Sequence, residues 1–152
     1  MKDTLLATLI DEHAAVEAFA SLLAVEQKAL LSLDGMNTLP RIVEQKTVLT
    51  QRLAGLEKAR DAQLAGLGLP AGRKGIEMAC EKDTRVASQW ELLKGSTDRA
   101  RRANITVGMM IRTRMDHNRR ALAILRGDLG GNGGGGGAML YGPDGRVPAF
   151  NL

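Results

Sequence analysis

Aromatic side chains are scarce in this sequence of 152 residues. Phe, Trp and Tyr make up 3% of the chain, whereas hydrophobic residues as a whole make up 44%. A core must therefore be built mainly from Leu, Ala, Val, Ile and Met, which suit helix seams better than sheets. The length is enough for one domain with one modest core.

Cysteine and long apolar runs are also lacking. Cys80 is the single cysteine, so the chain cannot form an internal disulfide and does not match a secreted, disulfide-rich fold. No uninterrupted apolar run approaches the ~20 residues of a membrane-spanning helix. Asp3, Asp11 and Glu12 lie where a signal peptide would be apolar. We expect a cytoplasmic protein that does not insert into membranes.

Groups that could form an active site are few. His13 and Glu17 share a helix face at i, i+4 spacing, but two ligands do not make a zinc site and no second His or Cys pair follows. Acidic neighbours of Cys80 disfavour a nucleophilic thiolate. The glycines of residues 65–75 lack the Gly-Lys-Ser/Thr ending of a phosphate loop. We therefore expect that the protein is not an enzyme and that it has no catalytic residue, no cofactor and no bound metal.

The dominant pattern is helical periodicity. Apolar residues recur at steps of three and four and predict long helices at about 4–33, 38–64 and 84–126, with a short helix at 76–82. The Gly-rich residues 65–75 predict a loop. The short link between the first two helices predicts an antiparallel hairpin. The expected fold is all-α: an elongated antiparallel hairpin or bundle of three long helices, in which the third packs along the hairpin and can extend past it.

Turn signals mark the ends of these helices. Asp34-Gly35 is expected to end the first helix, because glycine tolerates the left-handed conformation of many helix ends. Thr38 is a candidate N-cap for the second helix. Gly95 and Gly108 interrupt the third helix and leave its continuity open.

Several seam positions of the first two helices are polar. They are Glu12 and Glu26 in the first helix, and Lys46, Arg60 and Gln63 in the second. We interpret the carboxylates of these helices as solvated faces.

The net charge of +4 is unevenly distributed: residues 1–70 carry −2 and residues 71–152 carry +6. The third helix can present a solvated basic face partly paired with acids of the first two helices, contact an acidic protein, or bind nucleic acid. The spread of its arginines around the helix and the lack of interleaved aromatics disfavour nucleic acid. The arginines are Arg99, Arg101, Arg102, Arg112, Arg114, Arg119, Arg120 and Arg126.

The same helix carries methionines at positions 109, 110 and 115. They fit an ordinary core, but methionine also suits surfaces that accept more than one partner. An apolar strip on an over-long helix is where an amphipathic helix of a partner could dock. The predicted residues for binding a substrate protein are Ile111, Met115, Leu122 and Leu125.

The character of the sequence changes after Gly127. A glycine-rich linker leads to a short apolar tail that contains Tyr141. We expect two regions: a helical domain of residues 1–127, and a Gly-rich linker with a C-terminal tail at residues 128–152.

Several segments together resemble the FlgN family. Residues 22–30 and 44–60 are similar to its Leu-Leu…Glu-x-x-Ala-Leu segment and the Lys-x-x-Leu…Leu-Glu…Arg helix that follows. Residues 104–111 resemble its Asn-x-x-Asn-Gly-x-Leu-Ile motif. Residues 121–127 and 141–146 match its closing pattern, Leu-x-x-Leu followed by Tyr-Gly-Pro-x-Gly. The similarity covers nearly the whole chain.

This resemblance implies a bacterial flagellar type III export chaperone. Such a protein would bind the C-terminal helices of hook–filament junction proteins (FlgK- and FlgL-like), prevent their premature assembly and deliver them to the export gate. The resemblance associates Tyr141 with docking to the cytoplasmic domain of a gate component (FlhA-like).

Two other functions remain open from the sequence. A structural coiled-coil or adaptor protein would need no apolar tail, and a small basic nucleic-acid-binding protein would use the arginines directly. The seams can be satisfied within one chain or between chains, so a homo-oligomer also remains open.

Overall fold

The computed structural model describes residues 2–127, and every regular element among them is helical. The all-α expectation is confirmed. Residues 128–152, which include the linker, the tail and Tyr141, lie outside the described residues. The elements are α1 (Lys2–Leu31), the 3-10 turn η1 (Gly35–Asn37), α2 (Leu39–Gly66), α3 (Gly72–Lys82) and α4 (Thr84–Arg126).

The connection between α1 and α2 differs in detail from the expectation. α1 ends at Leu31, and Gly35 adopts no left-handed conformation. Glycine is needed there for space instead, because an added Cβ would collide with the carbonyl oxygen of Ala29. Thr38 precedes α2, but its hydroxyl donates to the Gly35 carbonyl at 2.7 Å and makes no capping bond to α2.

The loop expected at residues 65–75 is shorter than predicted. α2 continues to Gly66 and α3 begins at Gly72, and only Gly68 and Gly72 have positive φ in this turn, at 75° and 80°. The Asp61 carboxylate accepts the Gly72 N–H at 2.9 Å and so ties the turn to α2. Gly75 lies inside α3, where a Cβ would meet the Pro70 carbonyl.

α4 is one continuous helix of 43 residues, ~65 Å long at ~1.5 Å per residue. Gly95 and Gly108 do not interrupt it. The Asp83 carboxylate accepts the Arg85 N–H at 2.9 Å and caps the start. Gly127, with φ at 67°, supplies the left-handed C-cap.

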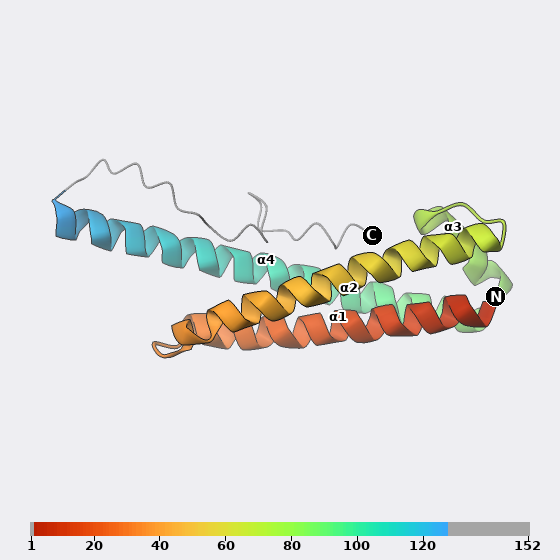
Figure 1. Cartoon of the computed structure of the whole chain (residues 1–152), viewed down its shortest axis with the longest axis horizontal. Coiled ribbons are helices and arrows are strands. Elements are labelled where there is room, and N and C mark those ends of the chain that lie inside the picture. Colours follow the sequence, from red (N-terminus) through yellow and green to blue (C-terminus); the bar gives the residue numbers. More distant parts are fainter. Residues whose placement is uncertain (1, 128–152) are drawn as a thin grey trace.

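The long helices pack as α1 between α2 and α4, and α3 covers the far end (Figure 1). The pairs Glu12–Arg60 and Glu26–Lys46 show that α2 runs antiparallel to α1. Polar contacts between α1 and α4 join residues that are 79–84 positions apart, from Asp3–Arg85 to Leu30–Arg114, so these helices are parallel. Because α1 ends at Leu31, this register leaves the last turns of α4 without a counterpart on α1.

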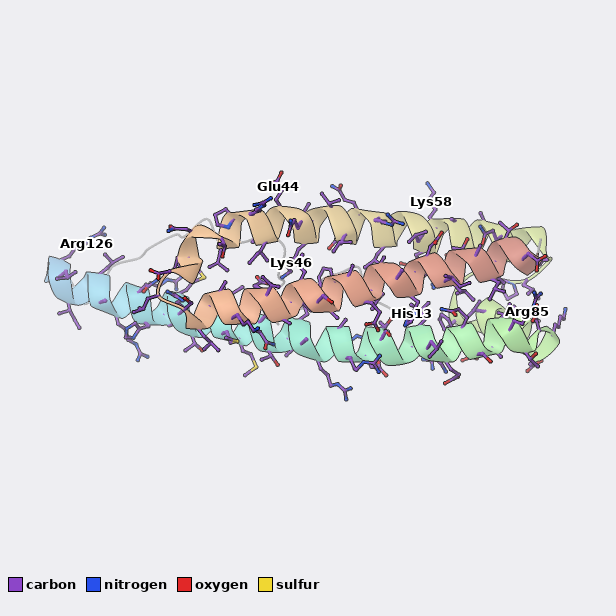
Figure 2. The ribbon with its side chains drawn as sticks, turned by 90° about the horizontal axis from the view of Figure 1, so that it is seen from below. His13, Glu44, Lys46, Lys58, Arg85 and Arg126 are labelled. Carbon is purple, nitrogen blue, oxygen red and sulfur yellow. The ribbon has the colours of Figure 1, made fainter. Side chains whose placement is uncertain are left out.

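Two buried ion pairs cross the α1–α2 seam. Glu12 accepts from Arg60 at 2.7 Å, and Glu26 accepts from Lys46 at 2.8 Å (Lys46 is labelled in Figure 2). Lys46 also lies 5.8 Å from the ring centre of Phe19. The expectation that the carboxylates of the first two helices are solvated is therefore wrong for Glu12 and Glu26, because the matching seam positions of α2 carry cations.

Burial changes the pKa values of these groups. Loss of solvation raises the pKa of Glu12 from 4.5 to about 7, although the nearby Arg60 charge opposes the rise. Burial lowers the pKa of Lys46, and the hydrogen bond and charge of Glu26 oppose that shift. The seam thus holds charged groups in an environment that disfavours their charged forms.

Candidate protein-binding site

The apolar seam of α4 begins in the core and ends in solvent. Towards the C-terminus, Ile111 and Met115 are half-buried, Leu122 is 48% exposed and Leu125 is 82% exposed. The four predicted substrate-binding residues therefore lie where the seam leaves the hairpin, and their role in binding remains a prediction. The buried seam residues before them are Val86, Trp90, Leu93, Thr97, Ala100, Asn104 and Val107.

We call residues 112–126, the last four turns of α4, the arm. Figures 1 and 2 both show the arm extending past the connection between α1 and α2. In Figure 2 the label of Arg126 marks the end of the arm. The expectation that the third helix projects beyond the hairpin is confirmed.

A groove lies at the base of the arm, between the end of α1 and α4. It encloses about 750 Å³ and is lined by apolar side chains that include Leu31, Leu33 and Met109. These side chains are 81%, 94% and 57% exposed. The Arg114 guanidinium closes one side by donating to the Leu30 carbonyl, one of the last carbonyls of α1 that have no partner within the helix.

Sequence reasoning missed part of this groove. Leu33 was expected on the apolar stripe of the first helix, but the helix ends two residues earlier and leaves Leu33 in solvent. A signal was present in the run Leu30-Leu31-Ser32-Leu33, which has more apolar residues than one helix face can bury. Met110 packs partly against the core whereas Met109 is exposed, so the methionine cluster serves both the core and the surface.

A second groove, of about 730 Å³, lies between α1 and α2. Val25 and Val48 line it and are 52% and 60% exposed. Arg41 and Glu44 at its edge carry opposite charges. This groove has no bias towards one sign of partner charge, unlike the arm.

A polar cluster between α1 and α4 brings a Ser, a His and a Glu together. His13 Nε2 lies 2.9 Å from Ser96 Oγ and 3.5 Å from the Glu17 carboxylate, and Ser96 Oγ donates to Glu17. This hydrogen bond is the main reason for the lowered pKa of Glu17. One imidazole nitrogen faces both partners, whereas a catalytic triad uses both nitrogens. Ser96 is 1% exposed, so a substrate could not reach it.

Other reactive groups also lack the setting for catalysis. Burial raises the pKa of the half-buried Cys80 thiol, which disfavours the thiolate. Residues 2–127 contain no group of three His, Cys, Asp or Glu side chains that could hold a metal ion. No helix in this part of the chain has the length and hydropathy needed to cross a membrane.

Comparison with known proteins identifies the family of this chain. The sequence model of the family described as "FlgN protein" matches residues 1–149. The chain belongs to the FlgN family. It is 27% identical over 139 residues to the "Flagella synthesis protein FlgN" of Yersinia enterocolitica, covering 90% of this chain and 84% of that protein. The protein of the same description from Y. enterocolitica serotype O:8 / biotype 1B (strain NCTC 13174 / 8081) gives the same identity and coverage. No solved structure matches.

Membership of the FlgN family makes this protein a flagellar synthesis chaperone and not an enzyme. The resemblance seen in the sequence is thus confirmed at the level of the family. Within the described residues, the arm, the groove at its base and the groove between α1 and α2 all expose apolar side chains.

Proposed function

We propose that this FlgN-family protein acts in the cytoplasm and uses its arm to bind the C-terminal helices of hook–filament junction proteins. It keeps those helices from assembling early and delivers them to the type III export gate. The observation that carries the proposal is the α4 seam, which continues past the hairpin with Leu122 and Leu125 exposed.

Hydrophobic burial supplies the driving force. The helices of an assembling filament cover their apolar stripes only after assembly, so a chaperone must cover them beforehand. Burial contributes ~25 cal/mol per Å² of apolar area removed from water. Ordering of the substrate helix offsets part of this gain, which keeps the complex reversible. The groove beside Met109 extends the apolar surface towards the hairpin.

Calorimetry with C-terminal peptides of junction proteins tests this site. Leu122→Ala/Leu125→Ala should weaken binding by about 10- to 100-fold, because both side chains would be central anchors. Leu92→Ala is a matched control, since Leu92 is 55% exposed on the bundled part of α4. Equal affinity of the double variant and the parent, with helicity intact, would remove these leucines from the site.

Delivery is assigned to the C-terminal tail. A Gly-rich linker lets Tyr141 contact the gate while the bundle holds its substrate, which raises the local concentration for the second contact. Tyr141→Ala should therefore keep its affinity for the substrate helix and lose affinity for the cytoplasmic domain of the gate. Equal gate binding by both proteins would contradict the role of Tyr141.

Deletion of residues 130–152 separates this function from that of a structural adaptor. A delivery chaperone without the tail should still hold its substrate but fail to export it. An adaptor would retain its function, because scaffolding needs only the helices.

A further inference from the structure

The arm, together with Ile111 directly before it, has the residue spacing of one helix of a short coiled coil. Ile111, Met115, Asn118, Leu122 and Leu125 follow steps of four and three, which are the a and d positions of a heptad repeat. Arg112, Arg119 and Arg126 recur every seven residues, each directly after a d position. They therefore occupy e positions, which border the apolar strip and face the flank of a partner helix.

The charges of the arm are poorly balanced within the chain. It holds five arginines and one acid, Asp116, which gives +4 with His117 neutral. Asp116 lies within about one helical turn of Arg112, Arg119 and Arg120, so one carboxylate faces three guanidinium groups.

The bundled part of α4 shows the contrast. There Arg85 contacts Asp3 at 3.0 Å, and Arg99 contacts Glu17 at 3.5 Å. These acids belong to α1, and α1 ends before it could supply acids to the arm. The helix dipole accounts for Arg126 in the last turn, but its effect does not extend to Arg119 two turns earlier.

We propose that the arm selects one class of partner: an amphipathic helix whose apolar stripe is flanked by aspartate or glutamate. The inference rests on the proposed function, because it uses the same apolar strip as the docking surface and adds the chemistry that selects the occupant. The partner's stripe covers Leu122 and Leu125, and its acids face Arg119 and the other e-position arginines. These ion pairs set the register and partner choice, and long-range attraction speeds the encounter.

A nucleic acid fits this surface less well. The e-position arginines follow the edge of an apolar strip that a phosphate backbone would leave in water. The arm also has no aromatic side chain for stacking on bases. An acidic amphipathic helix matches both the strip and its border.

Two designed peptides test the inference with the full-length protein. Both have the same apolar stripe, and the flanking positions carry glutamate in one and glutamine in the other. At 50 mM salt the glutamate peptide should bind about tenfold more tightly, the combined effect of two or three exposed ion pairs. The preference should vanish at 1 M salt, where the Debye length is only about 3 Å.

Adjacent arginines supply a matched pair of variants. Arg119 and Arg120 are both exposed, but Arg119 borders the strip whereas Arg120 lies on the opposite side of the helix. Arg119→Glu should abolish or reverse the preference for the glutamate peptide, and Arg120→Glu should retain most of it. Helicity measured by circular dichroism checks that both variants fold.

The outcomes separate this inference from the proposed function. Equal binding of the two peptides, no binding of either, equal effects of the two variants, or tighter binding of RNA that competes with the glutamate peptide would each overturn the inference. If junction-protein helices bind while the two designed peptides bind equally, the proposed function stands alone. If the glutamate peptide binds more tightly than the glutamine peptide but the junction-protein helices do not bind, the inferred partner chemistry is right and the proposed substrate is wrong.

Discussion

The bundled part of α4 and its arm belong to one helix with one kind of apolar spacing, yet their side chains are in opposite environments. In the bundle, Leu93 and Val107 are buried and Arg85 and Arg99 contact acids of α1. In the arm, Leu125 is 82% exposed and the arginines outnumber the acids five to one. The difference comes from helix length, since α4 has 43 residues and α1 has 30.

This difference shows that an apolar stripe on a helix predicts burial against another helix but does not identify that helix. Where α1 runs beside α4, the stripe of α4 is buried within the chain. Beyond Leu31 the register between the two helices has no further α1 residue to offer. We therefore expect substitutions in the bundle to change the free energy of unfolding, and substitutions in the arm to change binding.

The largest expected effect is in the buried charges of the bundle. Lys46→Met leaves the Glu26 carboxylate buried without its cation and should cost about 3–5 kcal/mol of stability in urea unfolding. Lys58→Met, at an exposed site on α2, should change stability by less than about 0.5 kcal/mol. The double variant Glu26→Leu/Lys46→Met should regain most of the loss, because no unpaired charge remains. A similar loss of stability in Lys46→Met and Lys58→Met would show that breaking the buried Glu26–Lys46 pair does not account for the effect.

A matched pair of leucines tests the comparison directly. Leu93→Ala opens a cavity in the bundle, where Leu93 is 1% exposed, and should cost about 3 kcal/mol. Leu125→Ala should change the free energy of unfolding by less than about 0.5 kcal/mol, since its side chain is already in water. A comparable loss for Leu125→Ala would mean that the arm packs against its own chain.

The third prediction compares the pH dependence of stability that comes from the buried Glu12 with that from the exposed Glu44. Glu12 has a folded-state pKa of about 7 against an ordinary value of 4.5, so the folded state binds more protons than the unfolded state between these pH values. The free energy of unfolding should therefore fall as pH rises from 4.5 to 7, by on the order of 2 kcal/mol from this group. Glu12→Gln should lose this decline when urea midpoints are compared at pH 5 and pH 7.5. Glu44→Gln, at an exposed site, should keep the profile of the parent, and the same profile in both variants would assign the decline to other groups.

Most of the fold could be predicted from the sequence, because the capping residues agreed with the apolar periodicity. The limits of α4 at Thr84 and Arg126 were predicted correctly, and Asp83 and Gly127 supply the caps that fix them. The loop before α3 was predicted too long, because glycine content alone does not distinguish positive φ at Gly68 from close packing at Gly75.

The buried ion pairs show where single-helix reasoning stops. Glu12 and Glu26 were recognised at seam positions, but the conclusion that they were solvated ignored the opposite charges on the next helix. In an antiparallel hairpin the numbers of facing residues have a constant sum, and Glu12 with Arg60 gives the same sum as Glu26 with Lys46. That test needs only the sequence and the hairpin. Predicting the exposure of Leu33 required the correct end of α1, and the apolar periodicity placed that end two residues too late.

The smallest expected effect asks whether the arm unfolds independently of the bundle. Ala24 on α1 and Ala121 in the arm are both exposed helical residues, and a change to glycine costs about 1 kcal/mol of helix stability at either site. Ala24→Gly should lower the global free energy of unfolding by that amount, because α1 is central to the bundle. Ala121→Gly should leave the urea midpoint unchanged and speed amide hydrogen exchange in residues 112–126 by about fivefold, because a region with few buried contacts opens locally. A shifted urea midpoint for Ala121→Gly would show that the arm unfolds together with the bundle. The apolar strip of the arm would then serve the stability of the fold and not the binding of a partner.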